Sequence, residues 1–227
     1  VNRDLRLYAS IFLPPLGSYS GTKYNDIIYD CFKGANTADS YNKFTLFNGY
    51  CPKKGCDPSI INNLGSTPTY TPIMRYAEVL LSYLEALNES QPSAIDQNIL
   101  DLTINDIRNR VKLTDIKKAD VPTQELVREA IRKERRVELA FEGLRYYDVL
   151  RWEIAEKELN HTFTGVKLSD DPNARNYRGS GTAASPVDEN MYYQFEKRTW
   201  SSHNRYFPIP QNDLNVNKNL KQNTGYN

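Results

Sequence analysis

The sequence predicts a mainly α-helical fold of helical hairpins with long irregular loops and a few short strands. Between residues 72 and 160, apolar residues recur at spacings of three and four, as on the buried face of amphipathic helices. On either side of this range the chain is rich in Tyr, Asn, Ser, Thr, Gly and Pro, which is typical of loops. We therefore expect a loop-rich segment with short strands (1–71), a helical hairpin core (72–160), and a surface loop with a wrapping carboxyl-terminal tail (161–227).

Three helical segments are expected in the core. The first begins at Pro72, with Thr71 as its cap, because proline suits the first helical position. The third begins at Thr123 and runs to about Asn160 with a bend at Gly143. Short links between such helices favour antiparallel hairpins, as in a tetratricopeptide-like solenoid. The apolar stripes of the first two helices are Ile73, Ala77, Leu80, Leu84 and Leu87, then Ile95, Ile99, Leu102, Ile107 and Val111.

Outside the core the sequence gives fewer local signals. The pieces "LYASIFL" and "FTLF" could be strands, and "MYYQF" interrupts the polar stretch before the tail. The tail "RYFPIPQNDLNVNKNL" has two prolines that favour an extended path, and we expect it to wrap the helices and stabilise the fold.

Composition and charge lower the expectation for several classes of function. The 29 basic and 28 acidic residues leave a net charge of +1, so no field would steer nucleic acid to the protein. No apolar run approaches the length of about 20 residues that crosses a bilayer. Cys51 and Cys56 could close a small disulfide loop in an oxidising compartment, but no second cysteine pair or nearby histidine completes a zinc site. We expect no metal and no cofactor.

A charge-rich stretch, "RKERRVELAFEGLRYYDVLRW", spans residues 132–152. On a helical wheel its acids and arginines alternate in one row close to Leu139, Phe141 and Leu144, which indicates partial burial. Partly buried ion pairs would fix the register between helices. We also expect Tyr146, Tyr147 and Trp152 to lie in the core, because they follow helical spacing. The residues of the predicted structural charge network are Arg135, Glu138, Glu142, Arg145, Asp148 and Arg151.

The same stretch suggests an alternative in which Glu138 and Glu142 act as paired catalytic carboxylates. The neighbouring arginines disfavour it, because they hold carboxylates ionised instead of raising the pKa of one of them. Nothing nearby in the sequence supplies a nucleophile. We therefore expect no catalytic residues.

Four blocks in order and spacing resemble the carboxyl-terminal region of the RagB/SusD family: "RYAEVLLSYLEALNE", "INDIRNRVKL", "IRKERRVELAFEGLRYYDVLRW" and "RYFPIPQNDLNVNKNLKQNTGY". The opening "NRDLRLYAS" resembles the family's "NRDPRL" segment, with Leu5 where proline is usual. Family members are roughly twice as long. The resemblance therefore implies a carboxyl-terminal domain, with the amino-terminal half and its lipid anchor absent from this chain.

This resemblance implies a non-catalytic lipoprotein on the outer membrane of Bacteroidetes, facing the exterior. Such proteins capture oligosaccharides, or in some cases peptides, and deliver them to a SusC-like TonB-dependent transporter. Contact with the membrane would occur only through the lipid anchor. Saccharides bind to exposed aromatic faces with polar groups at the edge. The loop residues that we expect to bind glycan are Tyr19, Tyr24, Tyr41, Tyr50 and Trp200.

Two other functions stay open at this point. The helical hairpins could present a groove to a protein or peptide, with no affinity for sugar. A glycoside hydrolase is the third possibility, although no spacing in the sequence singles out a pair of carboxylates.

Overall fold

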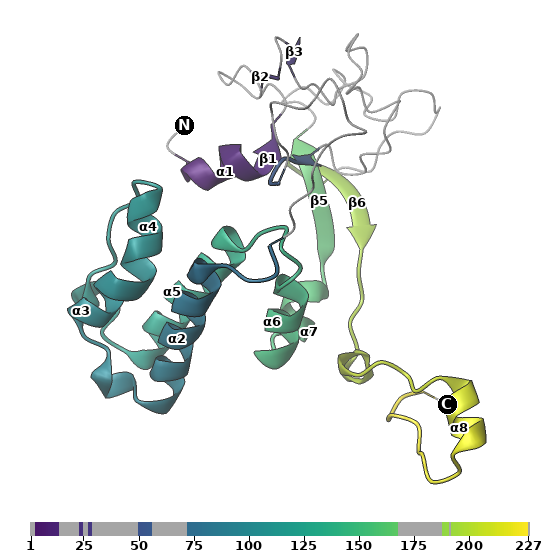
Figure 1. Cartoon of the computed structure of the whole chain (residues 1–227). Helices are drawn as coiled ribbons and strands as arrows, with labels where there is room; N and C mark the ends of the chain where they lie inside the picture. Colours follow the sequence, from purple (N-terminus) through teal and green to yellow (C-terminus); the bar gives the residue numbers. More distant parts are fainter. Residues whose placement is uncertain are drawn as a thin grey trace. The chain divides into compact units, whose positions relative to one another are not determined.

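The computed structural model divides the chain into two compact units, Val1–Arg145 and Tyr146–Asn227, which are described separately (Figure 1). Within the described residues the protein is mainly helical, with short two-stranded sheets, which confirms the predicted fold class. The structure describes residues 3–13, 23–24, 27–28, 50–55, 72–167, 188–190 and 192–226.

Two long helices dominate the first unit, α2 (Tyr76–Ser90) and α5 (Gln124–Glu138). They pack against each other and against the helical segment between them. That segment contains, in chain order, η2 (Pro92–Ala94), α3 (Gln97–Leu100), the π-helical turn η3 (Asp101–Asn105), α4 (Asp106–Arg110) and η4 (Lys118–Asp120).

Hydrogen bonds between helix ends show that α2 runs antiparallel to both α4 and α5. Arg75, directly before α2, contacts Glu138 at the end of α5, while Asn88 near the end of α2 contacts Gln124 at the start of α5. Arg110 at the end of α4 also contacts Glu138. The start of α2 and the ends of α4 and α5 therefore meet at one end of the helical hairpins.

The core of the first unit lies between these helices. The predicted stripes are confirmed in part. The side chain of Leu102 is 61% exposed, whereas Leu80, Leu84, Ile95 and Ile107 are buried. Burial of each such side chain contributes about 1.5–3 kcal/mol to folding. The buried apolar cluster consists of Leu80, Leu81, Leu84, Ile95, Leu100, Ile104, Ile107, Val121, Val127 and Ile131.

The start of the first helix was predicted wrongly. It begins at Tyr76 instead of Pro72, and the Ile73 side chain is fully exposed. Arg75 keeps an extended backbone (φ −122°, ψ 152°), and its guanidinium group bonds to carboxylates at the end of α5. The predicted cap at Thr123 is confirmed, because its side chain accepts a hydrogen bond from the Leu126 amide at 3.3 Å.

The third helical segment is interrupted more strongly than one bend at Gly143. Helix α5 ends at Glu138, and a turn follows in which Phe141 and Gly143 both have positive φ (66° and 79°). Helices α6 (Arg145–Arg151) and α7 (Ala155–Leu159) continue after it. Glycine adopts such a φ without steric cost, whereas Phe141 is an uncommon residue for it.

Short elements precede the hairpins. Residues Leu5–Ser10 form helix α1, capped by the Asp4 side chain, so "LYAS" is helical and the predicted strand is limited to β1 (Ile11–Phe12). Strand β1 pairs antiparallel with β4 (Cys51–Pro52). The other early pair is β2 (Lys23–Tyr24) with β3 (Ile27–Ile28). The piece "FTLF" and Cys56 lie outside the described residues.

The second unit contains a hairpin that the sequence analysis did not predict, β5 (Thr162–Lys167) paired antiparallel with β6 (Tyr192–Lys197). Two further elements, η5 (Ser202–Arg205) and α8 (Gln211–Val216), belong to the tail. The expected core positions of Tyr146 and Tyr147 are wrong, since their side chains are 39% and 67% exposed.

Side chains of the tail form hydrogen bonds with the backbone of the tail itself. The Gln222 side chain accepts a hydrogen bond from the Ile209 amide (2.8 Å) and donates one to the Ile209 carbonyl (2.9 Å). Asn223 donates to the Phe207 carbonyl at 2.7 Å. The tail thus folds back on itself, and its packing on the helices stays a prediction.

Candidate functional site

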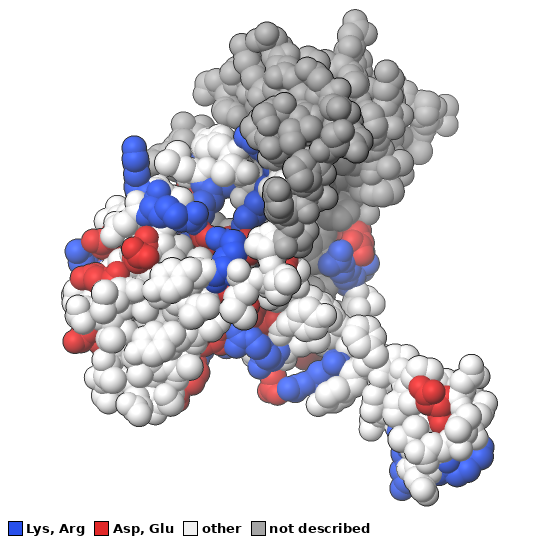
Figure 2. Space-filling model, viewed as in Figure 1, with Lys and Arg blue, Asp and Glu red and all other residues white. Residues whose placement is uncertain are grey.

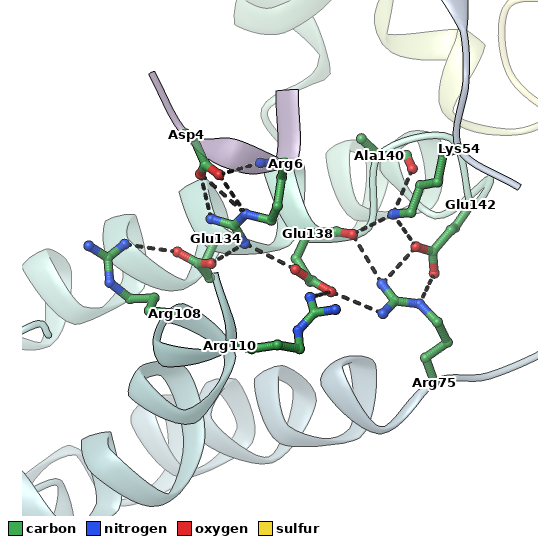
Figure 3. Close-up of polar contacts among 10 residues, drawn as sticks. All are labelled: Asp4, Arg6, Lys54, Arg75, Arg108, Arg110, Glu134, Glu138, Ala140 and Glu142. Carbon is green, nitrogen blue, oxygen red and sulfur yellow. Dashed lines mark hydrogen bonds and ion pairs between the residues drawn. The ribbon is translucent and has the colours of Figure 1, made fainter. Parts of the chain in front are cut away.

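The end of α5 carries two buried carboxylates, Glu134 and Glu138, one helical turn apart. Their side chains are 4% and 2% exposed, and a buried carboxylate is very unfavourable unless it is paired. Their partners come from several segments distant in the sequence (Figure 3).

Glu138 lies at the centre of the charge network. Its Oε1 accepts hydrogen bonds from Arg75 (3.0 Å) and Arg110 (2.6 Å), and its Oε2 accepts one from Arg6 (3.1 Å). Its main-chain oxygen accepts from Arg75 (3.0 Å) and from Lys54 (2.7 Å). One residue therefore connects α5 with α1, the β4 region, the start of α2 and the end of α4.

Glu134 forms the second branch of the network. Its carboxylate pairs with Arg6 through Oε1 and with Arg108 through Oε2 at 3.1 Å. Arg6 also bonds to both carboxylate oxygens of Asp4. Burial lowers the pKa of the Arg6 guanidinium, but these carboxylates outweigh that effect and raise it above the ordinary value. The hydrogen bond from Arg6 lowers the pKa of Asp4.

Glu142 forms the third branch, in the turn after α5. Arg75 donates from Nε to Oε2 (2.9 Å) and from Nη2 to Oε1 (2.7 Å), a two-point contact that is among the stronger ion-pair geometries. Lys54 pairs with the same carboxylate at 2.5 Å and donates to the Ala140 carbonyl at 3.1 Å. Burial raises the pKa of Glu142, but these cations outweigh it, so the pKa lies below its ordinary value.

The arrangement is suited to holding segments together. Each of the three carboxylates is paired with at least two basic side chains, which favours the ionised form. A general acid needs the opposite environment, one that keeps a proton on a carboxyl group at neutral pH.

The other residues of the predicted row lie in different surroundings. Arg135 is buried, donates to the Ser82 hydroxyl at 3.1 Å and lies 4.0 Å from the Glu85 carboxylate. In the second unit, Asp148 is buried and pairs with Arg151 at 2.8 Å. Sequence reasoning missed Glu134 within residues 132–152 and the partners that lie far from this stretch along the chain. These distant partners are Asp4, Arg6, Lys54, Arg75, Arg108 and Arg110.

The predicted glycan-binding residues are described only in part. Tyr19 and Tyr41 lie outside the described residues, and only the backbone of Tyr24 is described, in β2. Tyr50 is half-buried directly before β4. Trp200 is half-buried after β6, and its backbone is held by the side chain of Asn160, which donates to the Trp200 carbonyl at 3.2 Å.

A further surface feature lies on α2, opposite its buried face. Tyr76, Val79 and Tyr83 are 70%, 45% and 51% exposed, and the surface over this helix is largely free of charge in Figure 2. A shallow groove of about 390 Å³ follows it. The groove is lined by Met74, Glu78, Val79, Ser82 and Tyr83.

Among the described residues, no group of three or more His, Cys, Asp or Glu side chains could hold a metal ion. The described helices include none with the length and apolarity needed to span a bilayer.

Comparison with known proteins gives the family. The model of the SusD family matches residues 1–226. The chain belongs to the SusD family. A solved structure of a SusD-like carbohydrate binding protein from Bacteroides fragilis is 31% identical, with a TM-score of 0.77, and the match covers 97% of this chain and 42% of that one.

Two other SusD-like proteins are also similar to this chain. A second Bacteroides fragilis SusD-like structure is 28% identical with a TM-score of 0.69, and the match covers 99% of this chain and 39% of that one. The SusD-like protein P2 of Formosa agariphila is 34% identical over 117 residues, which are 49% of this chain and 22% of that protein. This SusD family member therefore spans less than half the length of these relatives.

Proposed function

We propose that this SusD family member binds oligosaccharides at the outer face of a bacterial outer membrane, as part of a lipid-anchored protein, and delivers them to a SusC-like TonB-dependent transporter. The observation that carries the proposal is the likeness over 97% of the chain to a structure described as a SusD-like carbohydrate binding protein. The family match over residues 1–226 supports it.

The role is binding without catalysis. The carboxylates of the charge network support this part of the proposal, because each is engaged by basic side chains. Glu138 and Glu142 share Arg75 between them, so neither has the environment of a general acid. In this role the network connects α1, α2, α4 and the end of α5 into a frame that supports the loops.

Saccharide contact is assigned to aromatic residues outside the helical core. Tyr19, Tyr24, Tyr41, Tyr50 and Trp200 remain the proposed contacts, since rings flanked by small polar residues in loops can stack on pyranose faces. Binding loops diverge between relatives with the same frame, so the fold does not determine which glycan binds.

Native-gel retardation of the 227-residue chain through a panel of plant, host and microbial polysaccharides tests the proposal. The same mixtures are assayed for released reducing ends, and a protein without saccharide affinity runs beside the chain as the control. We expect retardation by one polysaccharide class with no release. Release of reducing ends would contradict the non-catalytic role and favour a glycoside hydrolase. Retention of a transporter with no retardation by any polysaccharide would favour the protein-binding scaffold.

A further inference from the structure

The β5–β6 hairpin carries a mixed aromatic and charged face. Its register places Phe163 opposite Glu196, and the Arg198 amide donates to the His161 carbonyl at 3.3 Å. Because side chains alternate across a strand, His161, Phe163, Glu196 and Arg198 share one face. Lys197 pairs with Thr162 and lies on the other face.

Contacts among these four side chains confirm the shared face. The rings of His161 and Phe163 lie 4.2 Å apart, tilted by 32°. The Arg198 guanidinium lies 4.4 Å from the centre of the Phe163 ring, at cation–π distance. Arg198 also donates to the Glu196 carboxylate at 2.8 Å. The result is a stack of two tilted rings and one guanidinium, with the Glu196 carboxylate paired to the guanidinium.

The backbone of Trp200 is held close to this face by Asn160. The Asn160 side chain accepts a hydrogen bond from the Trp200 amide and donates one to the Trp200 carbonyl. Asn160 directly precedes His161, and Trp200 follows Arg198 by two residues. This contact continues the pairing of the two chain segments past the end of the hairpin. The backbone that carries the Trp200 indole is therefore fixed next to the stack.

Much of the stack is accessible at the surface. The side chains of Arg198 and Glu196 are 46% and 43% exposed, and His161 is also exposed. An ion pair this exposed contributes little to stability. The pair instead holds the Arg198 guanidinium and the Glu196 carboxylate in fixed positions beside the aromatic rings, where both can form hydrogen bonds with a ligand.

We propose that His161, Phe163, Glu196, Arg198 and Trp200 form a binding subsite for a neutral saccharide ring. The inference rests on the proposed saccharide-binding function and adds to it a location for the bound sugar. Of the loop residues predicted from the sequence, the subsite includes only Trp200. The rings provide an apolar surface for the C–H face of a pyranose, while Arg198 donates to hydroxyl oxygens and Glu196 accepts from hydroxyl groups. Because their charges cancel, an uncharged sugar fits this face better than an acidic one.

Binding isotherms of the 227-residue chain test the subsite. The probes are linear gluco-, manno-, galacto- and xylo-oligosaccharides, with an oligogalacturonate as the acidic comparison. The variants are Arg198→Gln, Glu196→Gln and Phe163→Ala, and the matched control is Lys197→Gln on the opposite face of the same strand. Thermal unfolding of each variant checks that it is folded. Phe163→Ala could unfold the hairpin, but Arg198 and Glu196 are exposed, so their variants should stay folded and still test the subsite.

The expected result is an affinity for one neutral oligosaccharide that falls about tenfold or more in Arg198→Gln and Glu196→Gln but not in Lys197→Gln. Blue-shifted tryptophan emission on saturation, retained when Trp152 is replaced by Phe, would place the sugar at Trp200 and support the subsite. Equal affinities of the parent and the hairpin variants would overturn the subsite while leaving the proposed function intact. A parent chain that binds none of the probes would contradict both.

Discussion

The Glu138 carboxylate accepts a hydrogen bond from Arg110 at 2.6 Å, although the two residues are separated by 28 positions and lie at the ends of different helices. The same oxygen accepts from Arg75 at 3.0 Å. A carboxylate whose side chain is 2% exposed is thus paired with cations that other segments of the chain supply. Glu138 therefore links the end of α5 to the end of α4 and to the residue before α2.

Replacing Glu138 by Gln should lower the free energy of unfolding by about 3–5 kcal/mol, because Arg6 and Arg75 would lose a buried counter-charge. Urea unfolding followed by circular dichroism measures the change. The control is Glu125→Gln on the same helix, where the side chain is 60% exposed and pairs with Arg128. We expect that control to stay within about 0.5 kcal/mol of the parent. A Glu138→Gln chain as stable as the control would show that the network contributes little.

Acid should destabilise the first unit. The pKa values of Asp4 and Glu142 are lowered in the folded chain by hydrogen bonds from Arg6 and from Arg75 and Lys54, against the opposing effect of burial. Groups with lowered pKa values stabilise the fold above their unfolded pKa, about 4, and this contribution is lost as the pH falls through the folded value.

Melting temperatures should therefore be nearly constant between about pH 7 and 5 and fall below about pH 4. Glu142→Gln removes one titrating group, so its melting temperature should start lower and fall less steeply with acid. Thermal scans of both chains across this range measure the effect. Parallel curves for the parent and the variant would contradict the assignment to Glu142.

Some of these features could be predicted because their signals are local in the sequence. Leu80 and Leu84 lie one turn apart and are both buried, and Thr123 caps the helix that it precedes. The start of α2 could not be located in the same way. Pro72 is a good first residue of a helix, but the contacts of Arg75 with Glu138 and Glu142 keep the backbone extended to residue 75.

The partners in the charge network illustrate the opposite case. Arg6 contacts Glu138 across 132 positions and Lys54 contacts its carbonyl across 84, and no periodicity in the sequence reports such distances. Burial of Glu138 could be inferred from its neighbours on the helix, whereas the identity of its cations could not. The β5–β6 face was missed for the same reason, since it forms only when residues about 35 apart pair.

Asn105 provides a test of a structural contact that the sequence analysis did not identify. It is fully buried in η3, and its amide accepts from the Ile116 N–H at 2.7 Å and donates to the Ile116 carbonyl at 3.0 Å. Asn105→Ala would leave the Ile116 N–H without this partner, at a cost of about 1–3 kcal/mol if it stays buried, while the Ile116 carbonyl keeps its hydrogen bond from Gln97 at 3.2 Å. Urea unfolding measures the loss. Asn98→Ala, at an exposed position in α3, should change stability much less, and equal effects would rule out this role of Asn105.

Gly225 allows a test of the tail alone. A Cβ atom at this position would lie 2.4 Å from the His203 Cβ, and the backbone has φ +92°, so Gly225→Ala introduces both a steric clash and strain. The matched control is Gly55→Ala, where φ is +86° but nothing lies within 4 Å of the added Cβ, so strain alone acts there. Because His203 packs edge-on against Tyr226 at 5.1 Å, the clash should separate the end of the tail from η5.

Hydrogen exchange of the Ile209 and Asn223 amides reports this separation, since both donate to the Gln222 side chain in the closed tail. We expect faster exchange at both amides in Gly225→Ala and unchanged exchange in Gly55→Ala. The helices of the first unit should keep their protection in the Gly225 variant if the tail is stabilised by its own contacts. Loss of protection in α2 and α5 as well would instead support the prediction that the tail wraps and stabilises the helices, because only packing between the two would transmit the change.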